Sequence, residues 1–414
     1  MLQRFSLIAA IILACGSNHA LSEPFSARPA PTMAAGAPMT FYVVKGAPDS
    51  CGRGCDRWIA VEGQIDPGAP GRFRRFLSAQ HERNLLIYFS SPGGSLDHAL
   101  SMGNMLRERP TIARVGRTVA SECGFEAQDG EACIRLKQSG RELHGELITR
   151  GAICASACPY LILGAATREI APDASLAVHS PKVVVRFRYG HPTQSAVEAA
   201  TERGEERADH LLESYLARMG ADVGLLDLAD TVKFEELHLL TREELVRFGI
   251  DRREFVETPW TFESKARSFV HKVAAQRKPG ETLFRTLQWQ LNCTDSDHFA
   301  MYFQRPAPAS PSFSTVSIII DAKPLNFAFP PAKPPGFEVW GMRMAKAQIQ
   351  SLADRPQLEF TETSTASDGR SVSQTSTLSS EGLAASLDRL LAACLPAKSP
   401  LPPQTTASDD RTEK

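Results

Sequence analysis

The sequence lacks an excess of charge of either sign. Its 414 residues include 46 Lys and Arg against 47 Asp and Glu, which gives a formal net charge of −1 at pH 7. A protein that binds nucleic acid or an anionic membrane through long-range electrostatics usually carries a surplus of basic residues. We therefore expect no nucleic-acid partner, and the chain length favours two domains that each bury a core.

The N-terminal apolar run is too short to cross a bilayer. It extends from Phe5 to Ala14, whereas a membrane-spanning helix needs ~20 apolar residues. Because Arg4 precedes the run and small residues follow it, the pattern predicts a secretory signal peptide over residues 1–22 and a periplasmic or secreted protein. The residues up to Cys15 also resemble a lipoprotein processing site, so lipid anchoring there, with membrane attachment, stays open as an alternative.

Motifs for metals and cofactors are missing as well. The sequence contains no HExxH, no phosphate-binding glycine loop and no GxSxG elbow. Two cysteine pairs, Cys51 with Cys55 and Cys154 with Cys158, have CxxxC spacing without a histidine partner, which is not the usual zinc pattern. We therefore expect no metal and no cofactor.

Two folded parts are predicted, with a change of pattern near Trp260. Before it, β-type runs alternate with helical spacing, and the continuous apolar run Leu85 to Phe89 is typical of a buried parallel strand. The pattern further predicts an inserted hairpin over 121–150, a helix over 155–166 and a later helix that opens with a capping box at Thr241 to Glu244. After it, a basic stretch from Ser264 to Lys278 has helical character, and alternating runs separated by Pro-rich turns follow. The predicted division is a signal peptide over 1–22, an Ala/Pro-rich linker over 23–40, an α/β domain over 41–260, a linker helix over 261–282, a mostly-β domain with a closing helix over 283–396, and a disordered tail over 397–414.

Two segments carry the residue types of a serine hydrolase site. Ser91-Pro-Gly-Gly-Ser95 directly follows the buried strand, and paired glycines there let a backbone N–H face a ligand, so Gly94 is a candidate oxyanion donor. Ser156 opens an apolar helical stretch as a candidate nucleophile, with the N–H of Ala157 as a second donor. His179 ends an apolar strand and is the candidate general base.

These segments, in this order, resemble the proteolytic subunit of Clp protease over roughly residues 41–255. The matching segments are Arg57 to Asp66, Ser91 to Ser95, Ala155 to Ala157, Val178 to Pro181, and Leu240 to Asp251. The resemblance implies the α/β spiral (ββα units) shared by Clp proteases, signal-peptide peptidases and crotonases. It also implies a peptide or protein substrate, a possible homo-oligomer, Ser156 as nucleophile, His179 as base, and Gly94 with Ala157 as oxyanion donors.

The third member of the catalytic triad departs from this pattern. The family places an aspartate where this sequence has Leu237. Asp230 and Glu236 are the nearby carboxylates that we consider as substitutes, with Glu235 as a further neighbour. Loss of the orienting acid can reduce kcat by about 10⁴-fold. The sequence therefore predicts either an exported serine peptidase or related hydrolase, or a catalytically degenerate scaffold that acts as a binding or assembly protein in the cell envelope.

Cysteine pairing follows from export. Of nine cysteines, removal of the leader takes Cys15 and leaves eight, which are expected to pair in an oxidising compartment. We predict one bond between Cys293 and Cys394 that joins the ends of the β domain, and a local loop closed by Cys51 and Cys55. The pairing of the other four stays open, including a bridge from the insertion over 121–150 to the nucleophile segment, or free thiols: Cys123, Cys133, Cys154 and Cys158.

Overall fold

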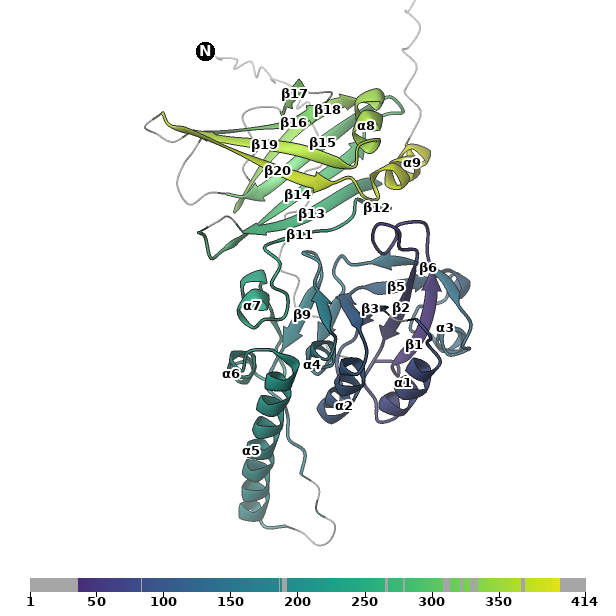
Figure 1. Cartoon of the computed structure of the whole chain (residues 1–414), viewed down its shortest axis with the longest axis vertical. Helices are drawn as coiled ribbons and strands as arrows, with labels where there is room; N and C mark the ends of the chain where they lie inside the picture. The colour runs from purple at the N-terminus through teal and green to yellow at the C-terminus, as the bar shows by residue number, and fades with distance from the viewer. Residues whose placement is uncertain are drawn as a thin grey trace, which may run out of the picture. The chain divides into compact units, whose positions relative to one another are not determined.

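The computed structural model describes residues 36–394, apart from residues 83, 186, 188–191, 265–266, 278–279, 308–312, 321–322, 328–331, 333 and 366–368. The expected signal peptide, Cys15, most of the linker and the C-terminal tail lie outside these residues. Within them the protein is a mixed α/β structure with four β-sheets and nine α-helices (Figure 1).

A seven-stranded sheet forms the centre of the N-terminal part, in the order β5-β6-β1-β2-β3-β4-β8. Strands β2, β3, β4 and β8 run parallel, whereas β1 pairs antiparallel with β2. The strand bounds are β1 Thr40–Lys45, β2 Arg57–Glu62, β3 Leu85–Ser90, β4 Thr111–Val115, β5 Arg117–Ala120, β6 Leu143–Ile148 and β8 Thr167–Glu169.

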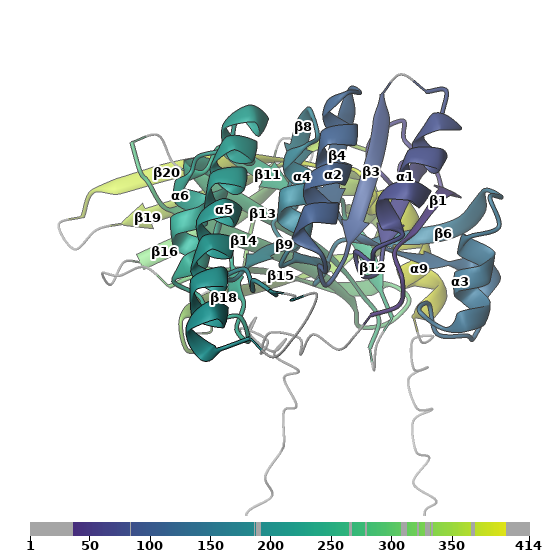
Figure 2. The same cartoon turned by 90° about the horizontal axis from the view of Figure 1, so that it is seen from below.

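Both faces of this sheet are covered, as the continuous apolar strand β3 requires. Alternate residues of β2 face opposite cores: Ile59 and Val61 join the larger core, and Trp58 and Ala60 join the smaller one. Three helices lie side by side on the larger core's face (Figure 2): α1 Ala69–Ser78, α2 Leu96–Arg107 and α4 Cys158–Leu163.

The insertion over 121–150 is only in part the hairpin that the sequence predicts. Strands β5 and β6 do pair antiparallel, from Arg117 opposite Ile148 to Ala120 opposite Gly145. Helix α3, Glu131–Lys137, lies between them, and β6 also pairs parallel with β1. The insertion therefore extends the main sheet and covers the smaller core.

A second, three-stranded sheet carries the residues of interest, in the order β10-β9-β7. Strand β7 is Ile153–Ala155, β9 is Ser175–Val178 and β10 is His238–Leu239. Strands β7 and β9 run parallel with Ala155 opposite Ala177, and β10 runs antiparallel to β9. Residues that follow β7 and β9 therefore emerge at the same end of two neighbouring strands.

Two helices, α5 and α6, lie between β9 and β10 in the chain, and a third, α7, follows β10. Helix α5, Gln194–Met219, is capped by Thr193 and ends at Gly220, whose φ of 69° suits glycine. Helices α6, Gly224–Asp230, and α7, Arg242–Arg247, come next. The predicted capping box of α7 is present, since Thr241 and Glu244 exchange hydrogen bonds with each other's backbone N–H.

The C-terminal part is mostly β, as expected, with α8 Lys346–Ala353 and the closing helix α9 Leu383–Ala393. Its strands, drawn green to yellow in Figure 1, form two antiparallel sheets of six and four strands around a core that includes Trp289, Phe303 and Trp340. The strand bounds are β11 Phe255–Glu257, β12 Thr261–Glu263, β13 Phe269–Arg277, β14 Phe284–Cys293, β15 His298–Pro306, β16 Phe313–Ile320, β17 Lys323–Asn326, β18 Phe337–Ala345, β19 Gln357–Thr365 and β20 Ser371–Ser379.

The predicted linker helix over 261–282 is wrong. Strands β12 and β13 occupy this stretch, and β13 pairs along its length with β14. The basic residues suggested a solvated helix face, but Lys272 is buried within β13, donates a hydrogen bond to the carbonyl of Thr258, and forms an ion pair with Glu257 at 3.0 Å. Pairing on both sides of the strand has overridden local propensity.

Eight cysteines form four pairs at disulfide distance. The predicted pairs Cys51–Cys55 and Cys293–Cys394 are confirmed. The pairing that the sequence left open is local in both cases, so no bridge joins the insertion to the nucleophile segment: the remaining pairs are Cys123–Cys133 and Cys154–Cys158.

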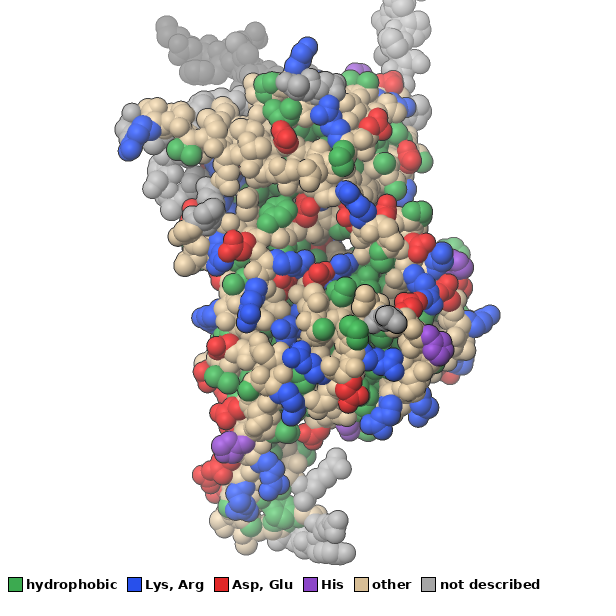
Figure 3. Space-filling model, viewed as in Figure 1, with side chains coloured by type: hydrophobic (Ala, Val, Ile, Leu, Met, Phe, Trp, Pro, Cys, Tyr) green, Lys and Arg blue, Asp and Glu red, His purple; other side chains and the backbone are tan. Residues whose placement is uncertain are grey.

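Among the described residues, no helix is both long and apolar enough to cross a membrane. Acidic and basic side chains are interspersed over the face of the molecule drawn in Figure 3.

Candidate functional site

The glycine turn after β3 is fixed from two sides. Its first residue, Ser91, donates its N–H to the carbonyl of Ile153 and accepts the N–H of Ala155, which ties the turn to β7. The Ser91 hydroxyl donates to the carbonyl of Gly63 at 2.7 Å and accepts the N–H of Gly93 at 3.1 Å. The turn is therefore held directly beside the strand that leads to Ser156.

The N–H of Gly94 in this turn points away from Ile65, the residue that supports the turn on its other side. Ile65 donates to the carbonyl of Gly93 at 2.7 Å and accepts the N–H of Ser95 at 3.0 Å. In this parallel pairing the N–H of Gly94 points to the opposite side, and it donates to no acceptor in the described part of the chain. The φ of Gly94 is 141°, a conformation that side-chain-bearing residues rarely adopt.

Ser156 occupies a sharp turn between β7 and α4. Its φ is 59°, and Asp49 is the other described non-glycine residue with positive φ. The N–H of Ser156 donates to the carbonyl of Ala177 at 2.8 Å, so the turn stays attached to β9. The expected helix over 155–166 is shorter, and Ser156 precedes it rather than lying in its first turn. Left-handed backbone in a non-glycine residue is unfavourable and persists where the surroundings enforce it, often at functional sites.

The glycine turn and the serine turn approach each other closely at Gly93. A Cβ atom there would lie 2.6 Å from the Cβ of Ser156 and 3.0 Å from the backbone nitrogen of Ala157. No side chain fits in that space, so glycine at position 93 is a condition of the contact. The N–H of Ala157, like that of Gly94, donates to no acceptor among the described residues. The two turns that meet at Gly93 thus contain two backbone N–H groups without an acceptor in the described part of the chain.

His179 follows β9 as Ser156 follows β7. Its ring is buried, and it meets the ring of Phe234 edge to face at 4.9 Å. Nδ1 lies 2.8 Å from the carbonyl oxygen of Ser180. Because a carbonyl oxygen can only accept, this bond places the proton on Nδ1 and leaves the lone pair on Nε2.

No hydrogen bond joins the Ser156 hydroxyl to His179 in the described structure. Ser156 follows β7 and His179 follows β9 at the same end of two neighbouring strands, which lie about 4.8 Å apart in a regular sheet. Because Ala155 pairs with Ala177, the register places Ser156 opposite Val178, one residue before His179. Catalytic hydrogen bonds are often long in structures without substrate and shorten when it binds.

The two candidate acids do not contact His179 in the described structure. Asp230 ends α6, and burial, together with the nearby Asp209 and Asp227, raises its pKa. Glu236 forms an exposed ion pair with Lys233 at 3.7 Å. The position opposite His179, by extension of the pairing of His238 with Val178, is Leu237. The partner that the structure gives to Nδ1 is thus a backbone carbonyl, a feature that no sequence motif marks.

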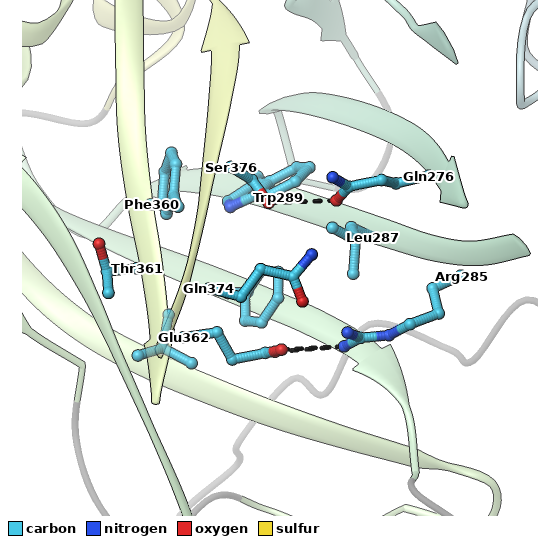
Figure 4. Close-up of a pocket in the computed structure, with 11 residues that line it drawn as sticks. Gln276, Arg285, Leu287, Trp289, Phe360, Thr361, Glu362, Gln374 and Ser376 are labelled. Carbon is cyan, nitrogen blue, oxygen red and sulfur yellow. Dashed lines mark hydrogen bonds and ion pairs between the residues drawn. The ribbon is translucent and has the colours of Figure 1, made fainter. Parts of the chain in front are cut away.

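Other chemistry is sparse in the described residues. They contain no group of three or more His, Cys, Asp or Glu side chains that could hold a metal ion. A hollow of about 20 Å³ in the β domain is lined by Trp289 and Phe360 and edged by the ion pair of Arg285 with Glu362 at 3.0 Å (Figure 4). This volume holds about one water molecule, so the hollow is too small for a substrate.

No protein-family model matches the chain, and no curated protein matches its sequence. Among solved structures, the chain is similar to a mutant of the 1510-N membrane-bound stomatin-specific protease, with 14% sequence identity and a TM-score of 0.29. The match covers 53% of this chain and 79% of that one. At so low a TM-score, the geometry of Ser156, His179 and the glycine turn remains the basis for inferring a function.

Proposed function

We propose that the chain is an exported serine hydrolase, and specifically a peptidase, with Ser156 as nucleophile and His179 as general base. The N–H groups of Gly94 and Ala157 form the oxyanion hole. The fold proposed for residues 41–260 is the Clp-protease-like spiral, followed by a separate β domain.

The observation that carries this proposal is the strained turn at Ser156. It combines a left-handed serine, a glycine whose missing side chain permits contact, and two backbone N–H groups without acceptors among the described residues. Left-handed backbone in a non-glycine residue occurs often at functional sites, and here it coincides with two backbone N–H groups that are available to a ligand.

The chemistry follows from the positions of the donors and acceptors. His179 accepts the Ser156 hydroxyl proton on Nε2 while Ser156 Oγ attacks the acyl carbon of the substrate. The resulting oxyanion accepts hydrogen bonds from Gly94 and Ala157, and the leaving group then takes the proton from Nε2. Water then attacks the acyl carbon while Nε2 of His179 accepts its proton, and Ser156 Oγ leaves and takes that proton back.

Orientation of the imidazole by a carbonyl has a kinetic consequence. The carbonyl of Ser180 fixes the tautomer that catalysis requires, which a carboxylate does in a full triad. It carries no full negative charge, so it stabilises the imidazolium ion less. We expect a hydrolase slower than one with a complete triad.

The alternative is a degenerate scaffold that binds a partner in the cell envelope. Its supporting observation is that His179 has neither a carboxylate partner nor a hydrogen bond to Ser156 in the described structure. The four disulfides support an oxidising compartment for either function. A homo-oligomer, and a lipid anchor at Cys15, remain open proposals.

Labelling with a fluorophosphonate distinguishes the two functions without knowledge of the substrate. We expect covalent labelling of the oxidised protein, its complete loss in Ser156→Ala, and a large reduction in His179→Gln. Ser175→Ala is the matched control, because Ser175 begins β9 at the end opposite His179. Labelling that persists in Ser156→Ala, or none in the folded wild type, would favour the scaffold.

A further inference from the structure

The nucleophile turn is enclosed by a disulfide. Cys154 lies in β7 and Cys158 is the first residue of α4, and their bond closes a loop that contains Ser156 at its centre. Both cysteines are fully buried. The cross-link therefore joins the strand before the turn to the helix after it.

Core packing and the disulfide, and not a helix cap, hold the helix side of this turn: all six residues of α4 are buried, and the hydroxyl of Tyr215 donates to the carbonyl of Tyr160. Helix α4 has six residues, too few to be stable by its own hydrogen bonds, and its start receives no side-chain cap. The strand side, in contrast, is tied by backbone hydrogen bonds: Ser91 donates to Ile153 and accepts from Ala155, and the carbonyl of Ala177 accepts the N–H of Ser156. Relaxation of Ser156 to the ordinary right-handed region would swing Cys158 and the N–H of Ala157 relative to β7.

From these observations we infer that the Cys154–Cys158 disulfide is a positioning element of the active site. It holds Ser156 in its left-handed conformation and keeps the N–H of Ala157 directed at the oxyanion position. The inference rests on the proposed function for its kinetic consequence, but its conformational claim stands on the backbone alone. It also implies that the site is assembled only in the oxidised protein, and hence only after export from a reducing compartment.

The chain supplies a matched control for this bond. Cys51 and Cys55 have the same spacing of four residues, and their Cα atoms are 5.1 Å apart against 5.2 Å for the bridge around Ser156. They precede β2, which ends just before Gly63, the residue whose carbonyl accepts the Ser91 hydroxyl. Removal of either disulfide opens a covalently closed loop of the same length, but only the loop closed by Cys154 and Cys158 contains Ser156.

The experiment compares the two double variants in labelling rate, melting temperature and amide exchange. For Cys154→Ala/Cys158→Ala we expect a fluorophosphonate labelling rate at least 10-fold below wild type and faster hydrogen exchange over residues 153–160. For Cys51→Ala/Cys55→Ala we expect a similar shift in melting temperature, a labelling rate within twofold of wild type and unchanged exchange over 153–160. Equal labelling rates in the two variants, at similar stability, would overturn the inference.

A second measurement tests the same inference on wild-type protein, in case either double variant does not fold. Wild-type protein is reduced in steps, free thiols are alkylated, and each species is mapped by mass spectrometry and scored for labelling. Loss of labelling should coincide with opening of Cys154–Cys158 and not with opening of Cys51–Cys55; the opposite order refutes the inference.

Failure of the proposed function would give a different result. An unlabelled wild type would remove the hydrolase, whereas a crystal structure of Cys154→Ala/Cys158→Ala that keeps Ser156 at positive φ would remove the positioning role.

Discussion

At the scale of single residues, the site depends on what is missing as much as on what is present. Gly93 has no side chain, and this absence lets the turn after β3 contact Ser156. Ser180 contributes its carbonyl, not its hydroxyl, to His179. The proposed nucleophile, the proposed base and Gly94 come from sequence motifs and stay predictions, whereas a backbone carbonyl acceptor such as that of Ser180 is available in every residue and has no sequence motif.

Gly93→Ala should damage both stability and reactivity. The new Cβ would lie 2.6 Å from the carbonyl oxygen of Ala155. The backbone would also be strained, because position 93 has a φ of 97°, which residues with a side chain rarely adopt. We expect a loss of about 2 kcal/mol in the free energy of unfolding and at least a 10-fold slower labelling of Ser156. Gly140→Ala is the control, since its φ is 77° with nothing within 4 Å, so it should lose stability without slower labelling.

Removal of the candidate acids should leave the chemistry unchanged. Because Nδ1 of His179 is bonded to the carbonyl of Ser180, Asp230→Asn and Glu236→Gln should each label within twofold of wild type. Labelling rates measured from pH 5 to pH 9 provide the check. A 10-fold reduction in either variant would show that the carboxylate reaches His179 during catalysis, as in a full triad.

At the scale of secondary structure, the sequence identifies strands and helices where periodicity and caps agree. The apolar run of β3, the capping box of α7 and the closing helix α9 all follow the prediction. The prediction failed at β13, where Lys, Arg and Ala favoured a helix. Only tertiary contacts, namely pairing with β14 and an ion pair for Lys272, decide that stretch.

The buried lysine of β13 should therefore matter for stability in a way that a surface lysine does not. Lys272→Ala removes the cationic partner of Glu257 and leaves this partly buried carboxylate with the N–H of Ser379 as its remaining hydrogen-bond donor in the described structure. We expect a loss of about 3 kcal/mol in the free energy of unfolding, measured by urea denaturation. Lys323→Ala, at an exposed position in β17, should change it by less than about 0.5 kcal/mol. Equal effects in the two variants would argue against the strand assignment.

At the scale of the whole molecule, covalent and ionic links join segments that are distant in the chain. Cys293 and Cys394, 101 residues apart, join the ends of the β domain. The buried carboxylate of Asp251 forms ion pairs with Arg242 at 2.8 Å and with Arg253 at 2.6 Å. It also accepts a hydrogen bond from the N–H of Ile170, the residue that follows β8. The disulfide could be predicted from sequence, because the cysteines of a chain expected to be exported should pair. The bond from Ile170 to Asp251 could not be predicted, because it joins segments that are distant in the chain.

Asp251 should make stability depend on acid pH. Its burial raises the carboxyl pKa, but hydrogen bonds and charge from Arg253 and Arg242 outweigh this and hold the pKa well below the ordinary value of 3.8. A carboxyl with a lowered folded-state pKa stabilises the protein above the unfolded-state pKa, and that contribution is lost as the pH falls through the folded-state pKa. Asp251→Asn should thus cost about 3 kcal/mol near pH 7 and progressively less below pH 4. A difference between variant and wild type that stays constant with pH would contradict this account.

The most direct test of the proposed active site is a crystal structure of the oxidised protein after reaction with a fluorophosphonate. The proposal predicts phosphorus bonded to Ser156 Oγ, with the phosphoryl oxygen about 2.7–3.1 Å from the backbone nitrogens of both Gly94 and Ala157. It also predicts that Nδ1 of His179 still donates its hydrogen bond to the carbonyl of Ser180. An unmodified Ser156, or a phosphoryl oxygen turned away from both N–H groups, would contradict the proposal.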